Sequence, residues 1–124
     1  MAKNESVFYR YLRDQFKSLS LIRIENSALQ GTPDLLIQNK KGTFFTVELK
    51  VIKSNRKPKF SPHQISFHVQ HSKNSFILIK QKSPVASAYK LYTGDQIKSL
   101  VSCGVKTPPV ACDLSACALI FENL

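Results

Sequence analysis

Acidic residues are scarce in this sequence of 124 residues. Asp and Glu number 8 against 18 Lys and Arg, which gives a formal net charge of +10 and a sequence pI near 9.7. Such an excess on a short chain is typical of a protein whose partner is rich in phosphate. A basic protein that binds no polyanion is the alternative. A basic amphipathic helix with an aromatic face, which would suit an anionic membrane surface, is missing.

Long apolar runs and paired cysteines are missing too. No apolar stretch reaches the roughly 18 residues that a membrane span requires, and the start, MAKNESVFYR, does not resemble a signal peptide. The three cysteines, Cys103, Cys112 and Cys117, are odd in number and form no CxxC pair. We therefore expect no disulfide and no structural zinc, but small thiols packed in the core of a cytoplasmic protein.

What the chain does contain is enough apolar sequence, 43%, to build one core over residues 1–124. Apolar spacing, turn residues and caps predict the secondary-structure elements. The expected order is a helix over 3–18 capped by Asn4, a strand over 20–25, a hairpin over 34–51, a helix from Ser61, strands over 75–80 and 87–93, and a helix over 94–101 stopped by Gly104. The last apolar segment, ACALIFEN, fits a strand or a helix. This order predicts an α/β domain with a central mixed β-sheet flanked by helices.

The hairpin GTPDLLIQNKKGTFFTVELK (31–50) has a register that its turn defines. With Lys40-Lys41-Gly42 as a three-residue loop and Gly42 in the left-handed region, paired residues have numbers that sum to 82. Side chains alternate along a strand, so one face is wholly apolar and predicts a core. That face holds Leu35, Ile37, Phe45, Val47, Leu49 and Val51.

The other face of the hairpin carries charge. Asp34 falls opposite Glu48, and Lys50 points to the same side two residues later. Opposed Cβ atoms lie about 5 Å apart, so the two carboxylates repel each other unless a cation joins them. Mg²⁺ takes carboxylate oxygens and keeps several waters, and Lys50 beside it could orient water or stabilise a phosphate. A solvated hairpin in which Lys50 merely neutralises the two acids is the alternative.

Pro33-Asp34, thirteen further residues and then Glu48-Leu49-Lys50 match the PD-(D/E)xK signature. With the hairpin spacing, the apolar flanks and a Glu-bearing helix ahead, the chain resembles the compact virus-type replication-repair nucleases (VRR-NUC) and the archaeal Holliday-junction resolvases. The resemblance covers about residues 5–80. It implies a single PD-(D/E)xK nuclease domain with a restriction-endonuclease-like fold over residues 1–124.

The resemblance also implies a role for each matching residue. Asp34 and Glu48 would ligate Mg²⁺ or Mn²⁺, with the backbone carbonyl of Leu49 as a further ligand. Lys50 would act on the nucleophilic water.

Two further residues match the resemblance on helices. Glu5 corresponds to an acid early on the first helix that reaches the metal directly or through water, with Glu25 as the alternative acid. Gln64 corresponds to a glutamine on the helix after the ELK strand. Both have structural explanations, since an acid in a first turn suits the helix dipole and Ser61-x-x-Gln64 is a capping box. At Gln64 both roles can coexist.

Phosphate contacts are expected from the basic side chains around this site. They position a duplex without reading its sequence, and no recognition helix or zinc finger is present. The predicted DNA contacts are Arg10, Arg13, Ser27, Lys53, Arg56, Lys57, Lys59 and His63, with added charge from Lys40 and Lys41. His63, His68 and His71 are spaced poorly for zinc, so we expect a solvated or DNA-facing helix face.

The sequence thus predicts a divalent-metal-dependent, structure-specific DNA endonuclease. By resemblance its substrate is branched DNA such as a Holliday junction, and its symmetric cutting implies a homodimer formed through apolar surface of the C-terminal third. A virus-encoded enzyme active in the host cytoplasm fits the small size. The alternatives are a nickase or duplex endonuclease of the same fold, and a catalytically silent nucleic-acid-binding module.

Overall fold

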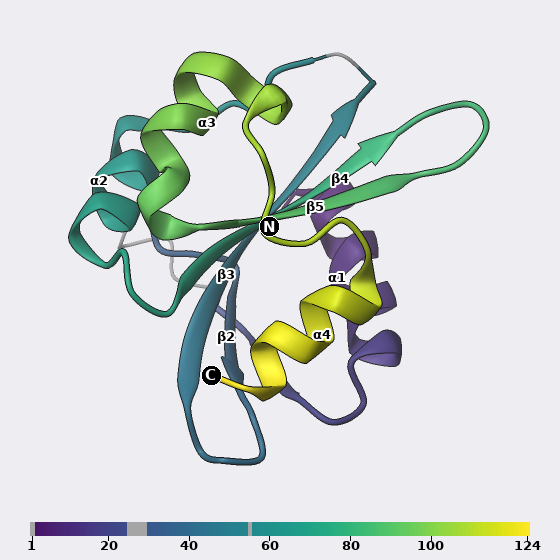
Figure 1. Cartoon of the computed structure of the whole chain (residues 1–124), viewed down its shortest axis with the longest axis vertical. Helices are drawn as coiled ribbons and strands as arrows, with labels where there is room; N and C mark the ends of the chain where they lie inside the picture. Colours follow the sequence, from purple (N-terminus) through teal and green to yellow (C-terminus); the bar gives the residue numbers. More distant parts are fainter. Residues whose placement is uncertain (1, 25–29, 55) are drawn as a thin grey trace.

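The structure is a computed structural model that describes residues 2–24, 30–54 and 56–124 (Figure 1). The elements in chain order are α1 (Lys3–Gln15), β1 (Ser20–Arg23), β2 (Leu35–Gln38), β3 (Phe44–Lys53), α2 (Pro62–Gln70), β4 (Ser75–Lys82), β5 (Ala88–Thr93), the 3-10 turn η1 (Gly94–Gln96), α3 (Ile97–Cys103), the 3-10 turn η2 (Gly104–Lys106) and α4 (Leu114–Glu122). The predicted DNA contact Ser27 and the alternative acid Glu25 lie outside the described residues.

The five strands form one sheet in the order β1-β2-β3-β4-β5. β3 and β4 pair in parallel, and the other neighbours pair antiparallel. The parallel pair needs a crossover, which α2 supplies. The expected α/β domain with a mixed sheet is confirmed.

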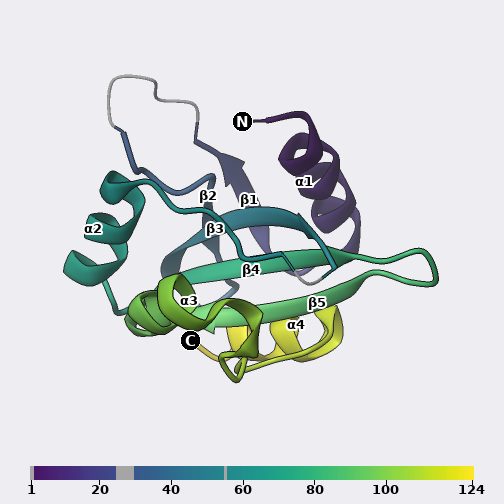
Figure 2. The same ribbon diagram turned by 90° about the horizontal axis from the view of Figure 1, so that it is seen from above.

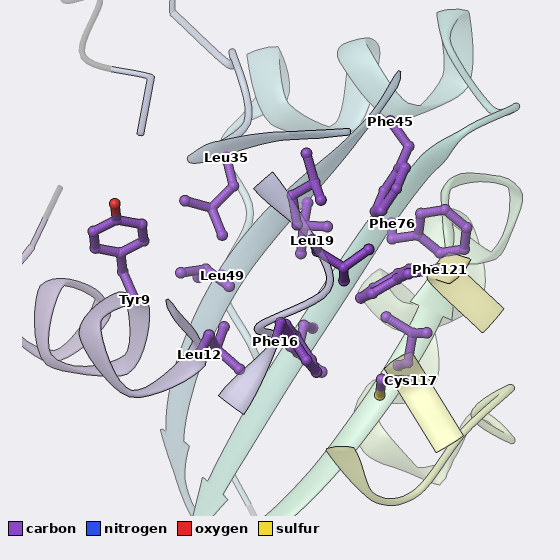
Figure 3. Close-up of a cluster of buried hydrophobic side chains, with 14 of the residues drawn as sticks. Tyr9, Leu12, Phe16, Leu19, Leu35, Phe45, Leu49, Phe76, Cys117 and Phe121 are labelled. Atoms are coloured by element: carbon purple, nitrogen blue, oxygen red, sulfur yellow. The ribbon is translucent and has the colours of Figure 1, made fainter. Parts of the chain in front are cut away.

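Helices cover both faces of the sheet (Figures 1 and 2). α1 and α4 pack on one face, where the main core joins Tyr9 and Leu12 to Leu49, Phe45 and Phe121 (Figure 3). A smaller core on the opposite face joins side chains of α3 to β4 and β5. The charged face of the hairpin, with Glu48, lies on the side of the sheet where α2 and α3 pack.

The hairpin register is the predicted one. Leu35 pairs with Val47 and Ile37 with Phe45, and all four are buried in the main core. The loop turns at Gly42, whose φ is +87°, a conformation that favours glycine. The predicted apolar face is confirmed, including Val51, which packs at the edge of that core.

The ends of the helices differ from the sequence prediction. α1 begins at Lys3 with Ala2 at the N-cap position, so Asn4 lies inside the first turn and does not cap the helix. It ends at Gln15 rather than at residue 18. The C-terminal segment, which fits a strand or a helix by sequence, is a helix, and the Asp113 side chain caps it by accepting a hydrogen bond from the Ala116 N–H at 2.7 Å.

The cysteines only partly follow the expectation. All three are free thiols, but Cys117 alone is buried in the core. Cys103 ends α3 and Cys112 precedes α4, and both side chains are exposed, so core packing was wrong for these two. Within the described part of the chain, no helix combines the length and apolar character needed to cross a membrane.

Candidate active site

Asp34 is held at the start of β2 by hydrogen bonds at both its backbone and its side chain. Its carbonyl oxygen accepts from the Ile24 N–H at 2.8 Å, and its carboxylate Oδ2 accepts from the Leu49 N–H at 2.8 Å. The second bond crosses to the middle of β3, beside Glu48. The sheet backbone therefore fixes the carboxylate of Asp34 against the strand that carries the ELK residues.

Gly31 explains part of this geometry that the sequence reasoning missed. Its φ is +85°, and a Cβ built on it would lie 2.4 Å from the backbone oxygen of His63. Only glycine leaves room for the chain to pass this close to the start of α2. The GTPD segment is thereby brought against the helix that carries Gln64, and the Gly-Thr-Pro sequence before Asp34 was the signal for it.

Glu48 is almost wholly buried, with 2% of its surface exposed. Burial, followed by the nearby Asp34 carboxylate, raises the pKa of Glu48 from 4.5 to about 9, although the positive charge of Lys50 opposes the shift. Its Oε1 atom has no hydrogen-bond partner among the described residues. Burying a polar atom without a partner is costly, and a cation bound at this oxygen would offset that cost.

Gln64 connects the two charged residues of β3. Its Nε2 donates to Oε2 of Glu48 at 3.4 Å, and its Oε1 accepts from Nζ of Lys50 at 3.1 Å. The same Oε1 accepts from the Ser61 N–H at 3.0 Å, while the Gln64 N–H donates to Oγ of Ser61 at 3.1 Å. The capping box is confirmed, and the structure also brings Gln64 to the predicted site.

Lys50 has a second neighbour, Phe60, that the sequence reasoning did not single out. Nζ of Lys50 lies 4.9 Å from the centre of the Phe60 ring, within the range of a cation–π interaction. The ring and Gln64 together restrict the ammonium group while leaving Lys50 half-buried at the edge of a groove. No property of the sequence around Phe60 indicated this contact.

Glu5 lies on the first turn of α1, at the wall of that groove. After burial and Asp34, the charge of Glu5 also raises the pKa of Glu48, which places Glu5 in the neighbourhood of the site. Within the described ranges, however, no three His, Cys, Asp or Glu side chains are clustered closely enough to hold a metal ion.

The donor set nevertheless suits a hard divalent cation. Two carboxylates, Asp34 and Glu48, approach each other, and one carboxylate oxygen of Glu48 is unpartnered within the described part of the chain. Mg²⁺ binds proteins through one or two carboxylates and fills its other positions with water. The two carboxylates therefore fit a hard divalent ion such as Mg²⁺ or Mn²⁺.

The structure places the predicted DNA contacts in different parts of the molecule. Lys53, Arg56 and Lys59 are exposed and line the same groove as Glu5 and Lys50.

Lys57 also lines the groove, but its Nζ donates to the backbone oxygen of Ser102 at 2.8 Å, which ties the basic loop to α3. Arg10 and Arg13 are exposed on α1, with Arg13 5.8 Å from the Tyr9 ring centre. His63 is exposed in the first turn of α2, and Ser27 lies outside the described residues.

The expected solvated histidine face is wrong for His68. Its ring is fully buried, and Nδ1 lies 2.7 Å from Oγ of Ser75. Burial, and then the charge of Lys50, lowers the pKa of His68 from 6.5 to about 4, so the ring is neutral at physiological pH. The reason is that α2 turns this residue toward β4 one helical turn after Gln64, whereas His63 and His71 face outward.

Comparison with known proteins places the fold of the chain among solved structures. No family model matches the chain, and no curated protein matches it. Among solved structures, the Holliday junction resolvase Hjc of Archaeoglobus fulgidus, from an archaeal hyperthermophile, aligns with a TM-score of 0.50 and 19% identity, over 73% of this chain and 78% of Hjc. A VRR_NUC domain aligns with a TM-score of 0.50 and 23% identity, over 82% of this chain and 98% of that domain. The chain therefore shares its fold with a Holliday junction resolvase and a VRR_NUC domain.

Proposed function

We propose that the chain is a divalent-metal-dependent DNA endonuclease that hydrolyses phosphodiester bonds in branched DNA such as four-way junctions. The observation that carries the proposal is the pairing of Asp34 with a buried, partly unpartnered Glu48 beside Lys50. A binding module gains nothing from two opposed carboxylates next to phosphate, because they repel the ligand. This favours an enzyme over a silent module.

The protein residues divide the work of hydrolysis. Asp34, Glu48 and the Leu49 carbonyl would hold the Mg²⁺ or Mn²⁺ ion, which polarises the phosphate and lowers the pKa of water. The Leu49 N–H keeps the Asp34 carboxylate in place, and Gln64 orients Nζ of Lys50. Lys50 then donates a hydrogen bond to the attacking water and offsets the negative charge that grows on the phosphate.

The basic groove would place the substrate. Exposed Lys53, Arg56 and Lys59 follow Lys50 directly along the chain and line the groove at the site. Such side chains bind phosphates of any sequence, which suits an enzyme that recognises DNA shape. The Holliday junction resolvase activity of one structural neighbour is the reason for naming a four-way junction as the substrate.

Symmetric cutting of a junction requires two sites, so we propose that the single nuclease domain formed by residues 1–124 acts as a homodimer. The C-terminal third offers exposed apolar side chains for the contact, at Val101, Val110 and Leu119. Light scattering of the eluted protein is expected to give twice the 14.0 kDa mass of the chain. A monomer at the concentrations used for cleavage would contradict the dimer.

One experiment tests the activity. Labelled four-way junction and a linear duplex made from one of its arms are incubated with the protein in Mg²⁺, in Mn²⁺ and in chelator. The wild type is expected to cut the junction only with the metal, and Lys50→Ala to bind it without cutting. Lys98→Ala, an exposed lysine of α3, is the matched control and is expected to cut normally.

The outcomes separate the alternatives. Binding without cleavage in either metal would favour a nucleic-acid-binding module. Equal cutting of junction and duplex would favour a general duplex endonuclease, and cutting of one strand alone would favour a nickase.

A further inference from the structure

The β4–β5 hairpin extends past the rest of the sheet and ends in a protruding loop (Figures 1 and 2). We call residues 82–88 the arm. Every residue of the arm is exposed, and its central residue, Val85, has 96% of its surface exposed, well above any other large apolar side chain of the described residues. A valine held this far from the core gains nothing for folding. Its position therefore calls for another explanation.

The arm is built to hold one shape. Oγ of Ser83 accepts a hydrogen bond from the Ala86 N–H at 3.2 Å and also bonds the Ala86 carbonyl, which closes the turn around Pro84 and Val85. At its base, Tyr89 stacks on Tyr11 of α1 with ring centres 6.5 Å apart and planes at 13°. A closed turn on a packed stem presents Val85 at little entropic cost on binding.

The arm starts beside the basic groove. Lys53 at the end of β3 pairs with Lys82 at the start of the arm, and the Ser54 N–H donates to the Lys82 carbonyl at 2.9 Å. The chain contains no Asp or Glu between Leu49 and Gly94. Over the same stretch it carries Lys50, Lys53, Arg56, Lys57, Lys59, Lys73, Lys80, Lys82 and Lys90. A polyanion bound in the groove thus meets the arm without encountering a negative charge on the strands between them.

The tip differs from this surface in chemistry. Pro84, Val85 and Ala86 carry no charge and no side-chain hydrogen-bonding group, so they do not suit phosphates. They suit apolar surface, and the apolar surface of DNA is the faces of its bases. In a linear duplex these faces are stacked and hidden, whereas at a branch point the stack is interrupted. Apolar side chains inserted at such steps are a known means of holding DNA in a distorted shape.

We infer that the arm is a wedge that places Val85 against unstacked bases at the branch point of the DNA bound in the basic groove. The inference rests on the proposed nuclease function and names what selects its substrate. Lys53 and Lys82 contact the flanking phosphates, and Val85 contacts the exposed base. The arm thereby adds affinity for branched DNA and none for a linear duplex.

The test compares Val85→Ser with Ile22→Ser in chelator, where no strand is cut. Ile22 is a matched control because it is an exposed β-branched residue on β1, the opposite edge of the sheet. Junctions carry 2-aminopurine either at the branch point or within one DNA helix away from it. Fluorescence and affinity are measured together. Val85→Leu, which keeps an apolar tip, is the second variant.

Wild type, Ile22→Ser and Val85→Leu are expected to raise the fluorescence of 2-aminopurine at the branch point and not within the DNA helix away from it. Val85→Ser is expected to lose that rise and about five- to tenfold of its junction affinity, while its duplex affinity stays within about twofold. Equal junction binding and fluorescence by Val85→Ser and wild type would overturn the wedge. So would a change of oligomeric mass in Val85→Ser, because the arm would then be a protein contact.

The two levels of the proposal fail differently. Wild-type protein that cuts junctions while Val85→Ser behaves identically would refute the wedge alone. Wild-type protein that neither binds nor cuts any of these DNAs would refute the nuclease function and the wedge with it.

Discussion

Asp34 and Leu49 are joined by a hydrogen bond of 2.8 Å between the carboxylate Oδ2 and the backbone N–H. The bond links the start of β2 to the centre of β3 and so fixes one carboxylate of the site through the backbone of the sheet. A flexible side-chain partner would give less control. The separation of the Asp34 and Glu48 carboxylates is therefore a property of the hairpin register.

Asp34→Asn tests this arrangement. The amide oxygen of asparagine accepts the same Leu49 N–H, so the fold is retained, but a metal ligand and a charge are removed. We expect junction cleavage in Mg²⁺ to fall by at least about 100-fold, with junction affinity unchanged or higher. Asp14→Asn, at an exposed position of α1, is the control and keeps full activity. Cleavage by Asp34→Asn within about threefold of wild type would show that the site is misplaced.

Gln64 and Ser61 separate capping from catalysis. Ser61→Ala removes the side-chain cap of α2 and is expected to cost about 1 kcal/mol of unfolding free energy with little change in cleavage rate. Gln64→Ala removes its half of the capping box together with the contacts to Lys50 and Glu48. We therefore expect a loss of stability similar to that of Ser61→Ala, but cleavage slower by at least about tenfold. Urea unfolding and single-turnover cleavage are measured on both variants. Equal cleavage rates would reduce Gln64 to a capping residue.

The stability of the metal-free protein depends on pH through two buried groups. Because the pKa of Glu48 is raised from 4.5 to about 9, the folded state binds a proton that the unfolded state releases, and stability falls as pH rises through this window. The pKa of His68 is lowered to about 4, so its contribution is complete above 6.5 and is lost as pH falls toward 4. Below pH 6.5 the two groups change stability in opposite directions. Above pH 6.5 the pH dependence of stability therefore comes from Glu48.

Urea unfolding in chelator, from about pH 6.5 to pH 8.5, measures this effect. The wild type is expected to lose stability with a slope of at most about 1.4 kcal/mol per pH unit, and Glu48→Gln to lose much less. Mg²⁺ is expected to reverse the loss, because it binds the ionised carboxylate of the folded protein. Parallel pH profiles for wild type and Glu48→Gln would contradict the raised pKa of Glu48.

The parts of the site that the sequence predicted are those set by local rules. The alternation of side chains along the strands, with Gly42 in the loop, places Asp34 beside Glu48. The Ser61-x-x-Gln64 capping box sets where α2 begins. The missed parts depend on contacts between distant segments. Burial of His68 requires knowing that α2 packs over β4 at Ser75.

The same holds for two other features that depend on contacts between distant segments. Leu114–Glu122 is apolar enough for a strand or a helix, and the sheet it covers decides the outcome. Lys57 belongs by sequence to a run of similar basic residues, yet its bond to Ser102 joins positions 45 residues apart. No local pattern distinguishes it from Arg56.

Arg56 and Lys57 therefore make a matched pair for DNA binding. Arg56 is exposed and lines the groove, whereas Nζ of Lys57 is bonded to the Ser102 carbonyl. Arg56→Gln is expected to reduce the slope of log affinity against log salt by about 0.9, the release of one counterion. Lys57→Gln is expected to reduce the slope by less and to lower the urea midpoint, because the loop loses its link to α3. If Lys57→Gln changes the salt slope as much as Arg56→Gln at unchanged stability, the bond to Ser102 does not hold Lys57 away from the DNA.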